Sequence, residues 1–251
     1  MGDRAVSDVV AYVLIFSMVS VTVGVVSVAG VASLQDVRDV EQVSNTERAF
    51  EVLADNLKDL HREGAPTRAT EISLANGAIS TISTATINVT GWSSGALSFS
   101  TGAVTSNVIR WRTSGGAEEL AYEFGTVIRS GRSGGIQTRR GPFQFDTERT
   151  IIPIVQTRAS NPSQYAEGIV RVRGARSVPS IVHRGEASTI DRIWVNLTTD
   201  HGLAWQQYFE GQSGTDCTLD QTGTRDRLDC SLDSRTELYV TIHPINVELE
   251  R

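Results

Sequence analysis

The sequence predicts an α+β protein in which one long N-terminal helix precedes an antiparallel, β-rich domain of sandwich type. Two observations lead to this prediction. From Val9 to Gln35 no residue is charged, and apolar residues then continue at helical spacing as far as Leu60. From Thr70 onward, short alternating runs rich in Ser, Thr, Val and Ile are separated by glycine-containing turns.

Residues 9–35 predict a transmembrane helix. Of the 26 residues from Val9 to Leu34, 19 are apolar. A helix of this length reaches about 40 Å, enough to cross a hydrocarbon core of about 30 Å. Its second half is rich in Val, Ser, Thr and Gly, and small residues let membrane helices approach closely. The segment therefore either packs against other helices or stands alone in lipid.

Two other interpretations of this segment are weaker. A cleaved signal peptide would be cut after Ala32, before Ser33, but the apolar stretch is too long and only Arg4 precedes it as a charged side-chain cation. A buried helix in a soluble domain rarely needs so many uncharged residues. Because Arg4 lies before the segment and the acidic run 36–41 follows it, residues 1–8 are predicted to be cytoplasmic and the C-terminal domain extracellular.

Residues 36–64 predict an amphipathic continuation of the same helix. Its apolar residues recur at three- and four-residue steps in one stripe, formed by Val37, Val40, Val43, Phe50, Leu53, Leu57 and Leu60. The spacing breaks between Val43 and Phe50, which favours packing on the protein's own domain over a coiled coil. Gly64 and Pro66 predict the helix end.

Residues 65–251 predict the β-rich head, with about nine to twelve antiparallel strands. One interruption, from Asp200 to Gly211, predicts a short helix capped by Asp200. Residues 64–199 carry 14 Arg and 9 acidic residues, whereas residues 200–251 carry 4 Arg and 10 acidic residues. These opposite net charges compensate each other within the domain or between neighbouring subunits, and the former is simpler.

Three features are typical of a domain outside the cell. Cys217 and Cys230 flank a polar segment, so they form either a disulfide across a hairpin or two unpaired thiols. Asn88 and Asn196 begin N-glycosylation sequons at predicted strand ends, although sequons also arise by chance in a Thr-rich chain. Of 23 basic residues only Lys58 is a lysine. Such a bias is typical of halophilic archaea and also of GC-rich genomes.

The sequence predicts no enzymatic activity, no cofactor, no metal site and no small-molecule substrate. The segment from Gly91 to Gly95 matches the Gly-x-Ser-x-Gly pattern of hydrolases, but the residues after it alternate like a strand, which predicts a hairpin turn. The four histidines lack metal-ligand spacing and are expected in surface or structural roles: His61, His183, His201 and His243. No nucleic-acid partner is expected at a pI of about 5.3.

One basic segment, residues 129–141, is a candidate binding loop. Its glycines and arginines can cradle an anion such as a phosphate or an acidic polysaccharide, with Arg129, Arg132, Arg139 and Arg140 as the candidate residues. The segment lacks the lysine and the strand-to-helix context of a phosphate-binding loop. A basic hairpin without a ligand is the simpler interpretation.

The N-terminus resembles a known signal. The run Arg4-Ala5-Val6-Ser7-Asp8, leading directly into the apolar helix, resembles the class III signal of archaeal type IV pilin-like proteins. This resemblance implies cleavage between Ala5 and Val6 by a prepilin peptidase, a helix that stays in the membrane or in a filament of pilin-like subunits, and a β-rich head outside. Asp8 stands where haloarchaeal members often have proline. It either pairs with the new amino group of Val6 on an adjacent subunit or contacts cytoplasmic water.

The whole chain is also similar to a group of uncharacterised haloarchaeal proteins. The similarity lies in the N-terminal run, in residues 65–69 and in the segment from Trp205 to Glu210. Two functions follow as hypotheses. One is a pilin-like, single-pass cell-surface glycoprotein that is a minor subunit of a type IV pilus-like assembly. The other is a monomeric, membrane-anchored extracellular domain that binds a glycan or an anion and does not polymerise.

Overall fold

The chain forms two compact units, residues 1–44 and residues 45–251. The computed structural model describes residues 3–74, 77–131, 134–146, 148–160, 163–186, 190–233 and 237–251, without the side chains of residues 3–9, 28–39, 186 and 233. We call the second unit the head. It includes helical residues that the sequence analysis placed before the head, in the segment ending at residue 64.

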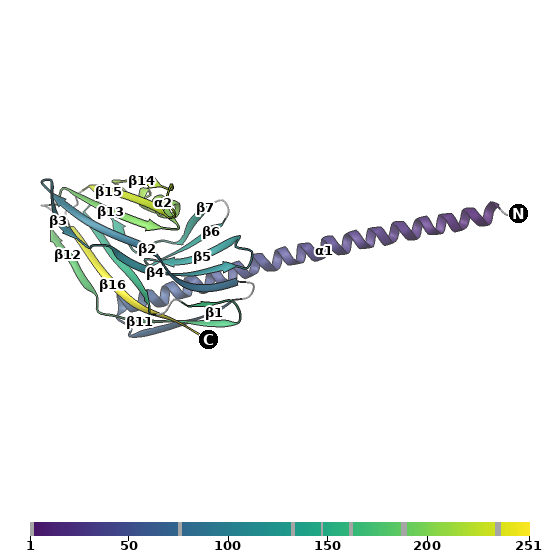
Figure 1. Cartoon of the computed structure of the whole chain (residues 1–251), viewed down its shortest axis with the longest axis horizontal. Helices are drawn as coiled ribbons and strands as arrows, with labels where there is room; N and C mark the ends of the chain where they lie inside the picture. The colour runs from purple at the N-terminus through teal and green to yellow at the C-terminus, as the bar shows by residue number, and fades with distance from the viewer. Residues whose placement is uncertain are drawn as a thin grey trace. The chain divides into compact units, whose positions relative to one another are not determined.

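One helix, α1 (Asp3–Lys58), occupies the N-terminal part of the chain and continues as a short π-helical segment, η1 (Asp59–Glu63) (Figure 1). Gly64 has a φ of 77°, a left-handed conformation that glycine adopts without steric cost. The Ala65 N–H donates to the Asp59 carbonyl over 3.2 Å, which satisfies one of the last helical acceptors. The predicted helix end at Gly64 and Pro66 is confirmed.

The described part of the head contains two sheets. Sheet A has the order β1-β11-β16-β9-β8, with β12 also beside β16, and sheet B has the order β14-β15-β13-β2-β4-β5-β6-β7, with β3 and β10 also beside β2. Their bounds are β1 (Thr67–Ser73), β2 (Gly77–Ser93), β3 (Ala96–Ser100), β4 (Val104–Thr113), β5 (Glu118–Glu123), β6 (Thr126–Gly131), β7 (Gly134–Arg139), β8 (Gln144–Phe145), β9 (Arg149–Ala159), β10 (Gln164–Tyr165), β11 (Ile169–Arg176), β12 (Ser180–Glu186), β13 (Arg192–Thr199), β14 (Thr215–Asp220), β15 (Asp226–Asp233) and β16 (Glu237–Glu250).

Two expectations about the strands were wrong. The described residues form more strands than the sequence predicted, partly because β8 and β10 have only two residues each and show no periodic pattern. One pair is parallel rather than antiparallel, since β16 runs beside β9 in the same direction. Residues 160–236 lie between these two strands in sequence, which gives the chain enough length to return and enter sheet A in that direction.

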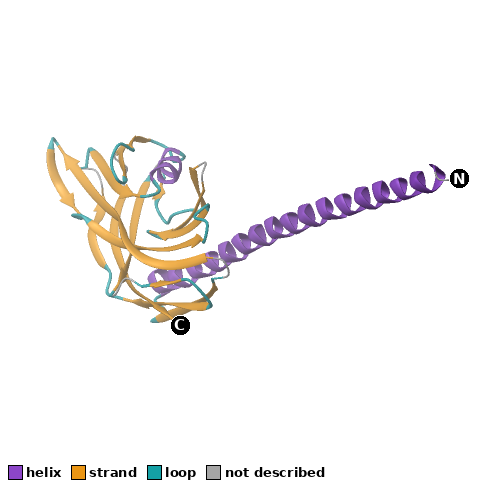
Figure 2. Cartoon of the chain, turned by 45° about the vertical axis from the view of Figure 1, so that its right-hand side comes forward, coloured by secondary structure: helices purple, strands orange, loops and turns teal. Residues whose placement is uncertain are grey.

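The core lies between the two sheets and beneath a short helix, α2 (Gly202–Glu210). Side chains of both sheets and of α2 meet there, among them Val89, Ile152, Val240, Trp205 and Phe209. In β2, buried and partly exposed residues alternate along most of its length, as expected for a strand with one face on a core. The head is therefore a β-sandwich with α2 packed against β7, β13, β14 and β15 (Figure 2).

The predicted helix between Asp200 and Gly211 is confirmed as α2, but its predicted cap is wrong. His201 occupies the N-cap position, and its side chain makes no capping hydrogen bond. The first helical N–H, that of Gly202, donates to Asp226 over 3.0 Å. Asp200 instead forms ion pairs with Arg110, at 3.6 Å, and with Arg225, at 3.7 Å. These two ion pairs engage the Asp200 carboxylate, which the sequence had predicted to cap the helix.

The last turns of α1 and the segment η1 belong to the core of the head. Phe50, Leu53, Leu57 and Leu60 are buried. A Cβ atom on Gly174 of β11 would lie 2.6 Å from Leu57 Cδ2 and 2.9 Å from Leu60 Cδ1, so this glycine lets the helix lie directly against sheet A.

The same helical turns also contact sheet B. Arg129 of β6 pairs with Glu47 at 3.3 Å, and Arg139 of β7 pairs with Asp55 at 2.5 Å. The end of the helix is thus held between the two sheets. The predicted apolar stripe is confirmed at Val43 and from Phe50 onward. It is wrong at Val40, which is 70% exposed, and the side chain of Val37 lies outside the described residues.

Candidate functional site

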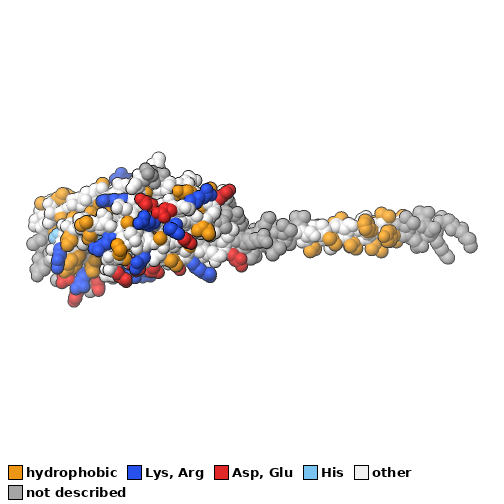
Figure 3. Space-filling view, turned by 90° about the horizontal axis from the view of Figure 1, so that it is seen from below, with side chains coloured by type: hydrophobic (Ala, Val, Ile, Leu, Met, Phe, Trp, Pro, Cys, Tyr) orange, Lys and Arg blue, Asp and Glu red, His pale blue; other side chains and the backbone are white. Residues whose placement is uncertain are grey.

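One segment of α1, Val10–Ser27, is long and apolar enough to cross a membrane. It falls within the predicted range 9–35. Its large apolar side chains are exposed, with Tyr12 at 71% and Met18 at 75%, and apolar side chains cover this part of the helix in Figure 3. Thr22 donates its hydroxyl to the Met18 carbonyl over 2.7 Å, so this polar group is satisfied within the helix, as a lipid environment requires.

The predicted processing residues lie at the start of α1. The backbone of Ala5, Val6 and Asp8 is helical. Their side chains lie outside the described residues, so the ion pair expected at Asp8 stays a prediction.

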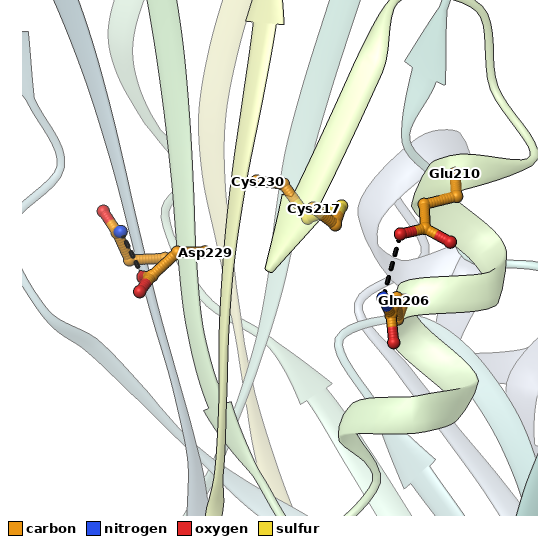
Figure 4. The surroundings of a disulfide bond; sticks show 6 residues. Gln206, Glu210, Cys217, Asp229 and Cys230 are labelled. Atoms are coloured by element: carbon orange, nitrogen blue, oxygen red, sulfur yellow. Dashed lines mark hydrogen bonds between the residues drawn. A yellow bond between two sulfur atoms is a disulfide. The ribbon is translucent and has the colours of Figure 1, made fainter. Parts of the chain in front are cut away.

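Cys217 and Cys230 are joined by a disulfide. They lie directly opposite each other on the paired strands β14 and β15, with Cα atoms 4.1 Å apart. Helix α2 runs beside this pair, and its residues Gln206 and Glu210 are joined by a hydrogen bond of 2.9 Å (Figure 4). The disulfide closes the β14–β15 hairpin at the edge of sheet B.

The two sequon asparagines lie within strands, not at strand ends as predicted. Asn88 of β2 and Asn196 of β13 are direct cross-strand partners in the middle of sheet B. The Asn196 Nδ2 atom, which would carry a glycan, donates to Asp229 over 2.6 Å. The composition of the sequence predicted that the strand around Asn88 ends close to that residue. In the structure β2 extends over 17 residues and continues past Asn88.

The structure places three of the four candidate arginines on or directly after one hairpin. Strands β6 and β7 form a hairpin, and Arg129 pairs there with Glu118, at 3.0 Å, as well as with Glu47. Arg132 lies outside the described residues. Arg139 is the last residue of β7 and Arg140 follows it, and both line a pocket together with residues of α1 and η1. The segment therefore forms a basic hairpin, as the simpler interpretation predicted, and of its described arginines only Arg139 and Arg140 line this pocket.

The hydrolase-like pattern from Gly91 to Gly95 lies in a hairpin, as the alternation after it predicted. Ser93 at the end of β2 pairs with Ala96 of β3, and no helix follows the turn. Among the residues that the structure describes, no group of three His, Cys, Asp or Glu side chains is arranged to hold a metal ion.

A buried ionic network under α2 was not predicted. The His201 imidazole, 3% exposed, lies between Glu119 at 2.8 Å and Glu123 at 3.1 Å. Trp205 Nε1 and the Thr199 hydroxyl also donate to Glu123, over 2.8 and 2.9 Å. Every oxygen of this fully buried carboxylate therefore has a donor.

These contacts keep His201 charged. Burial alone would lower its pKa, but the hydrogen bonds to Glu119 and Glu123 and their charges outweigh burial and raise the pKa to about 10. Burial would likewise raise the pKa of Glu119, yet the bond to His201 and the nearby arginines lower it. The network is an enclosed, satisfied ion cluster, and its geometry fits a structural role that joins α2 and β13 to β5.

Ion pairs also join the two oppositely charged segments within one head. Arg149 pairs with Glu237 at 2.7 Å, and Arg173 pairs with Glu250 at 3.8 Å. Charge compensation is thus at least partly intramolecular.

A family model described as a family of unknown function, DUF7289, matches residues 4–248. The chain belongs to DUF7289. The match covers both the apolar helix and the head, from the start of α1 to β16. No curated protein and no solved structure matches this DUF7289 chain.

Several candidate site residues of this DUF7289 member escaped sequence analysis for a common reason. Glu119, Tyr122 and Lys58 belong to no motif, and their neighbours in space are far away in sequence. One signal was available for the network: His201 directly precedes a helix-like segment that contains Trp205, a residue whose indole N–H needs an acceptor when buried.

Proposed function

We propose that this protein is a pilin-like, single-pass surface protein and a minor subunit of a type IV pilus-like assembly, with a mechanical rather than a catalytic role. The observation that carries the proposal is the exposed apolar surface of Val10–Ser27 on a helix whose other end is built into the core of the head. Exposed apolar surface of this extent is costly in water, so it calls for lipid or for neighbouring helices.

The proposal assigns successive roles to the parts of α1. A prepilin peptidase removes residues 1–5 on the cytoplasmic side, and Val6 becomes the new N-terminus. The apolar segment then holds the subunit in the membrane or packs against other subunits, and the head is displayed outside the cell. Burial of Phe50 and Leu57 supports these separate roles, because it makes the end of α1 part of the core of the head.

The alternative function is a membrane-anchored extracellular binding domain that never polymerises. A specific observation favours it: the pocket shared by Arg139, Arg140 and the end of the helix offers a site for an anion. This alternative function requires the same membrane-anchoring helix but no contact between subunits.

N-terminal sequencing of the membrane-bound form tests the processing step. The proposal expects a start at Val6. A start at Ser33 would show a cleaved signal peptide and would overturn both anchored functions.

Shearing of cells, followed by detection of this chain in filaments, tests assembly. The Asp8→Ala variant is expected to lose incorporation into filaments, whereas the control Asp36→Ala, beyond the apolar segment, is expected to retain it. A correctly processed chain that never enters filaments would favour the monomeric binding domain.

A further inference from the structure

A small pocket lies where the end of the helix meets sheet B. It has a volume of about 170 Å³ and is lined by residues of α1 and η1, by the β5–β6 turn and by the segment after β7. Pockets for drug-sized ligands measure roughly 300–1,000 Å³, so this one suits a single small group. We call it the basic pocket, because Lys58, Arg62, Arg139 and Arg140 line it and no carboxylate does.

Two acidic residues of the helical segment near these cations are engaged by arginines. Asp55 binds Arg139 at 2.5 Å, and Asp59 binds Arg68 at 3.1 Å. Within the described residues, Lys58, Arg62 and Arg140 form no ion pair. The pocket therefore gathers three cations whose charge is not neutralised by a bonded carboxylate, beside a fourth that is held in place by Asp55.

A buried donor also lines the basic pocket. Tyr122 of β5 is 1% exposed, and its hydroxyl has no hydrogen-bond partner in the described part of the chain. A buried hydroxyl without a partner is unfavourable and uncommon, and this one is left available to donate to a group bound in the pocket. Burial also raises the pKa of Tyr122, so the hydroxyl keeps its proton.

His61 contributes no charge to the basic pocket near neutral pH. Its burial lowers its pKa to about 4, and its Nδ1 atom lies 3.1 Å from the Leu57 carbonyl. Because a carbonyl oxygen only accepts, the neutral His61 carries its proton on Nδ1 and donates it to Leu57. Its Nε2 atom is then a buried acceptor without a partner among the described residues. The positive charge of the pocket thus comes from lysine and arginine and does not depend on histidine.

We propose that the basic pocket binds a phosphate or sulfate group, with Lys58, Arg62 and Arg140 supplying positive charge and the Tyr122 hydroxyl donating a hydrogen bond. Such a tetrahedral oxyanion matches the small volume and accepts several charge-assisted hydrogen bonds at once, to which the planar guanidinium groups are well suited. The bound group connects the end of the helix to the segment after β7. Binding therefore stabilises the docked helix, whether or not the protein assembles into filaments.

Thermal unfolding of the full-length chain in detergent micelles tests this inference, with inorganic phosphate or sulfate replacing chloride at constant ionic strength. We expect a saturable rise in Tm. The double variant Arg62→Gln, Arg140→Gln is expected to raise the apparent Kd at least tenfold. The control Arg184→Gln removes an exposed arginine on β12 away from the pocket and is expected to bind like the unaltered chain.

Tyr122→Phe provides a test that does not depend on charge. It is expected to leave the Tm without anion unchanged or higher, because the lost hydroxyl had no partner, and to weaken phosphate binding several-fold. A rise in Tm of equal size in all variants would show a general salt effect and would overturn the proposal, as would the absence of saturation.

Glucose 6-phosphate, measured beside inorganic phosphate, distinguishes the source of the bound group. Tighter binding of the sugar phosphate assigns the pocket to a group carried on a larger molecule, and tighter binding of the inorganic ion assigns it to the free anion. Either result supports an oxyanion site.

Discussion

At position 201, a histidine enclosed by protein carries a charge because two glutamates surround it. His201 and Glu119 hold each other in their ionised forms, and Glu123 receives further hydrogen bonds from Trp205 and Thr199. A buried ion cluster of this kind is stable only while it is complete, since removal of one member leaves an unpaired charge away from water.

The His201→Gln variant is therefore expected to lose about 3 kcal/mol of stability at pH 7. The pKa of His201 in the folded chain, about 10, lies above the ~6.5 of an unfolded histidine. Its contribution is thus complete below about pH 6.5 and declines as the pH rises towards 10. Thermal unfolding of the full chain from pH 6 to pH 10 measures this decline.

His183→Gln is the matched control, because His183 stacks on Phe99 outside the network. It is expected to retain the alkaline decline, whereas His201→Gln is expected to lose most of it. An unchanged alkaline decline in His201→Gln would show that another group causes it.

At the scale of single elements, the end of the helix is the part on which the head depends most visibly. Gly174 gives the helix room on sheet A, and salt bridges from Glu47 and Asp55 connect it to sheet B. The helix is both the connection to the anchor and a layer of the core.

Gly174→Ala is expected to destabilise the head by about 1–3 kcal/mol, because the added methyl group would overlap Leu57 and Leu60. Gly115→Ala is the control, since a Cβ there meets no atom within 4 Å. A comparison of the two Tm values measures the effect. Equal stability of the two variants would mean that the helix does not pack closely against β11.

The disulfide stabilises a second element, the β14–β15 hairpin. Its cysteines are 13 residues apart, and closing a loop of that length is worth about 3 kcal/mol in the chain-entropy description. The Cys217→Ser, Cys230→Ser double variant should therefore unfold at a lower temperature than the oxidised chain. Intact-mass analysis after alkylation without reduction checks the pairing itself, and alkylation of both thiols would contradict it.

The sequence predicted those elements that local patterns determine. The helix end at Gly64 and Pro66 and the helix α2 are examples, because capping and 3.6-residue periodicity act over a few residues. The parallel pairing of β9 with β16 was missed, since it joins residues that are far apart in sequence, such as Arg149 and Glu237, which are 88 residues apart. For the candidate site, the sequence identified basic residues but not the side chains that they bind. Arg129, for example, binds Glu47, and these two residues are 82 positions apart in the sequence.

At the scale of the whole molecule, the boundary between the two compact units lies inside α1. The head begins at Asn45, before the four large apolar side chains of the helical segment that are buried in it, Phe50, Leu53, Leu57 and Leu60. Together these side chains contribute on the order of 8 kcal/mol, which is comparable to the net stability of about 5–15 kcal/mol typical of a folded protein.

A shortened chain that starts at Asn45 is therefore expected to fold without detergent and to show cooperative thermal unfolding. A chain that starts at Gly64 lacks the helical layer and is expected to aggregate or to remain unfolded. Size-exclusion chromatography and circular dichroism distinguish the two. Equal folding of both would show that the helix end is dispensable for the head.

The position of β16 sets an order for the folding of the head. This strand lies inside sheet A, between β11 and β12 on one side and β9 on the other, and it comes last in sequence among the described strands. Sheet A cannot close until residues 237–250 have been synthesised and are free to enter it. A head that crosses a membrane during or after synthesis would therefore remain without its second layer during transit, and would complete its sandwich only after residues 237–250 have arrived.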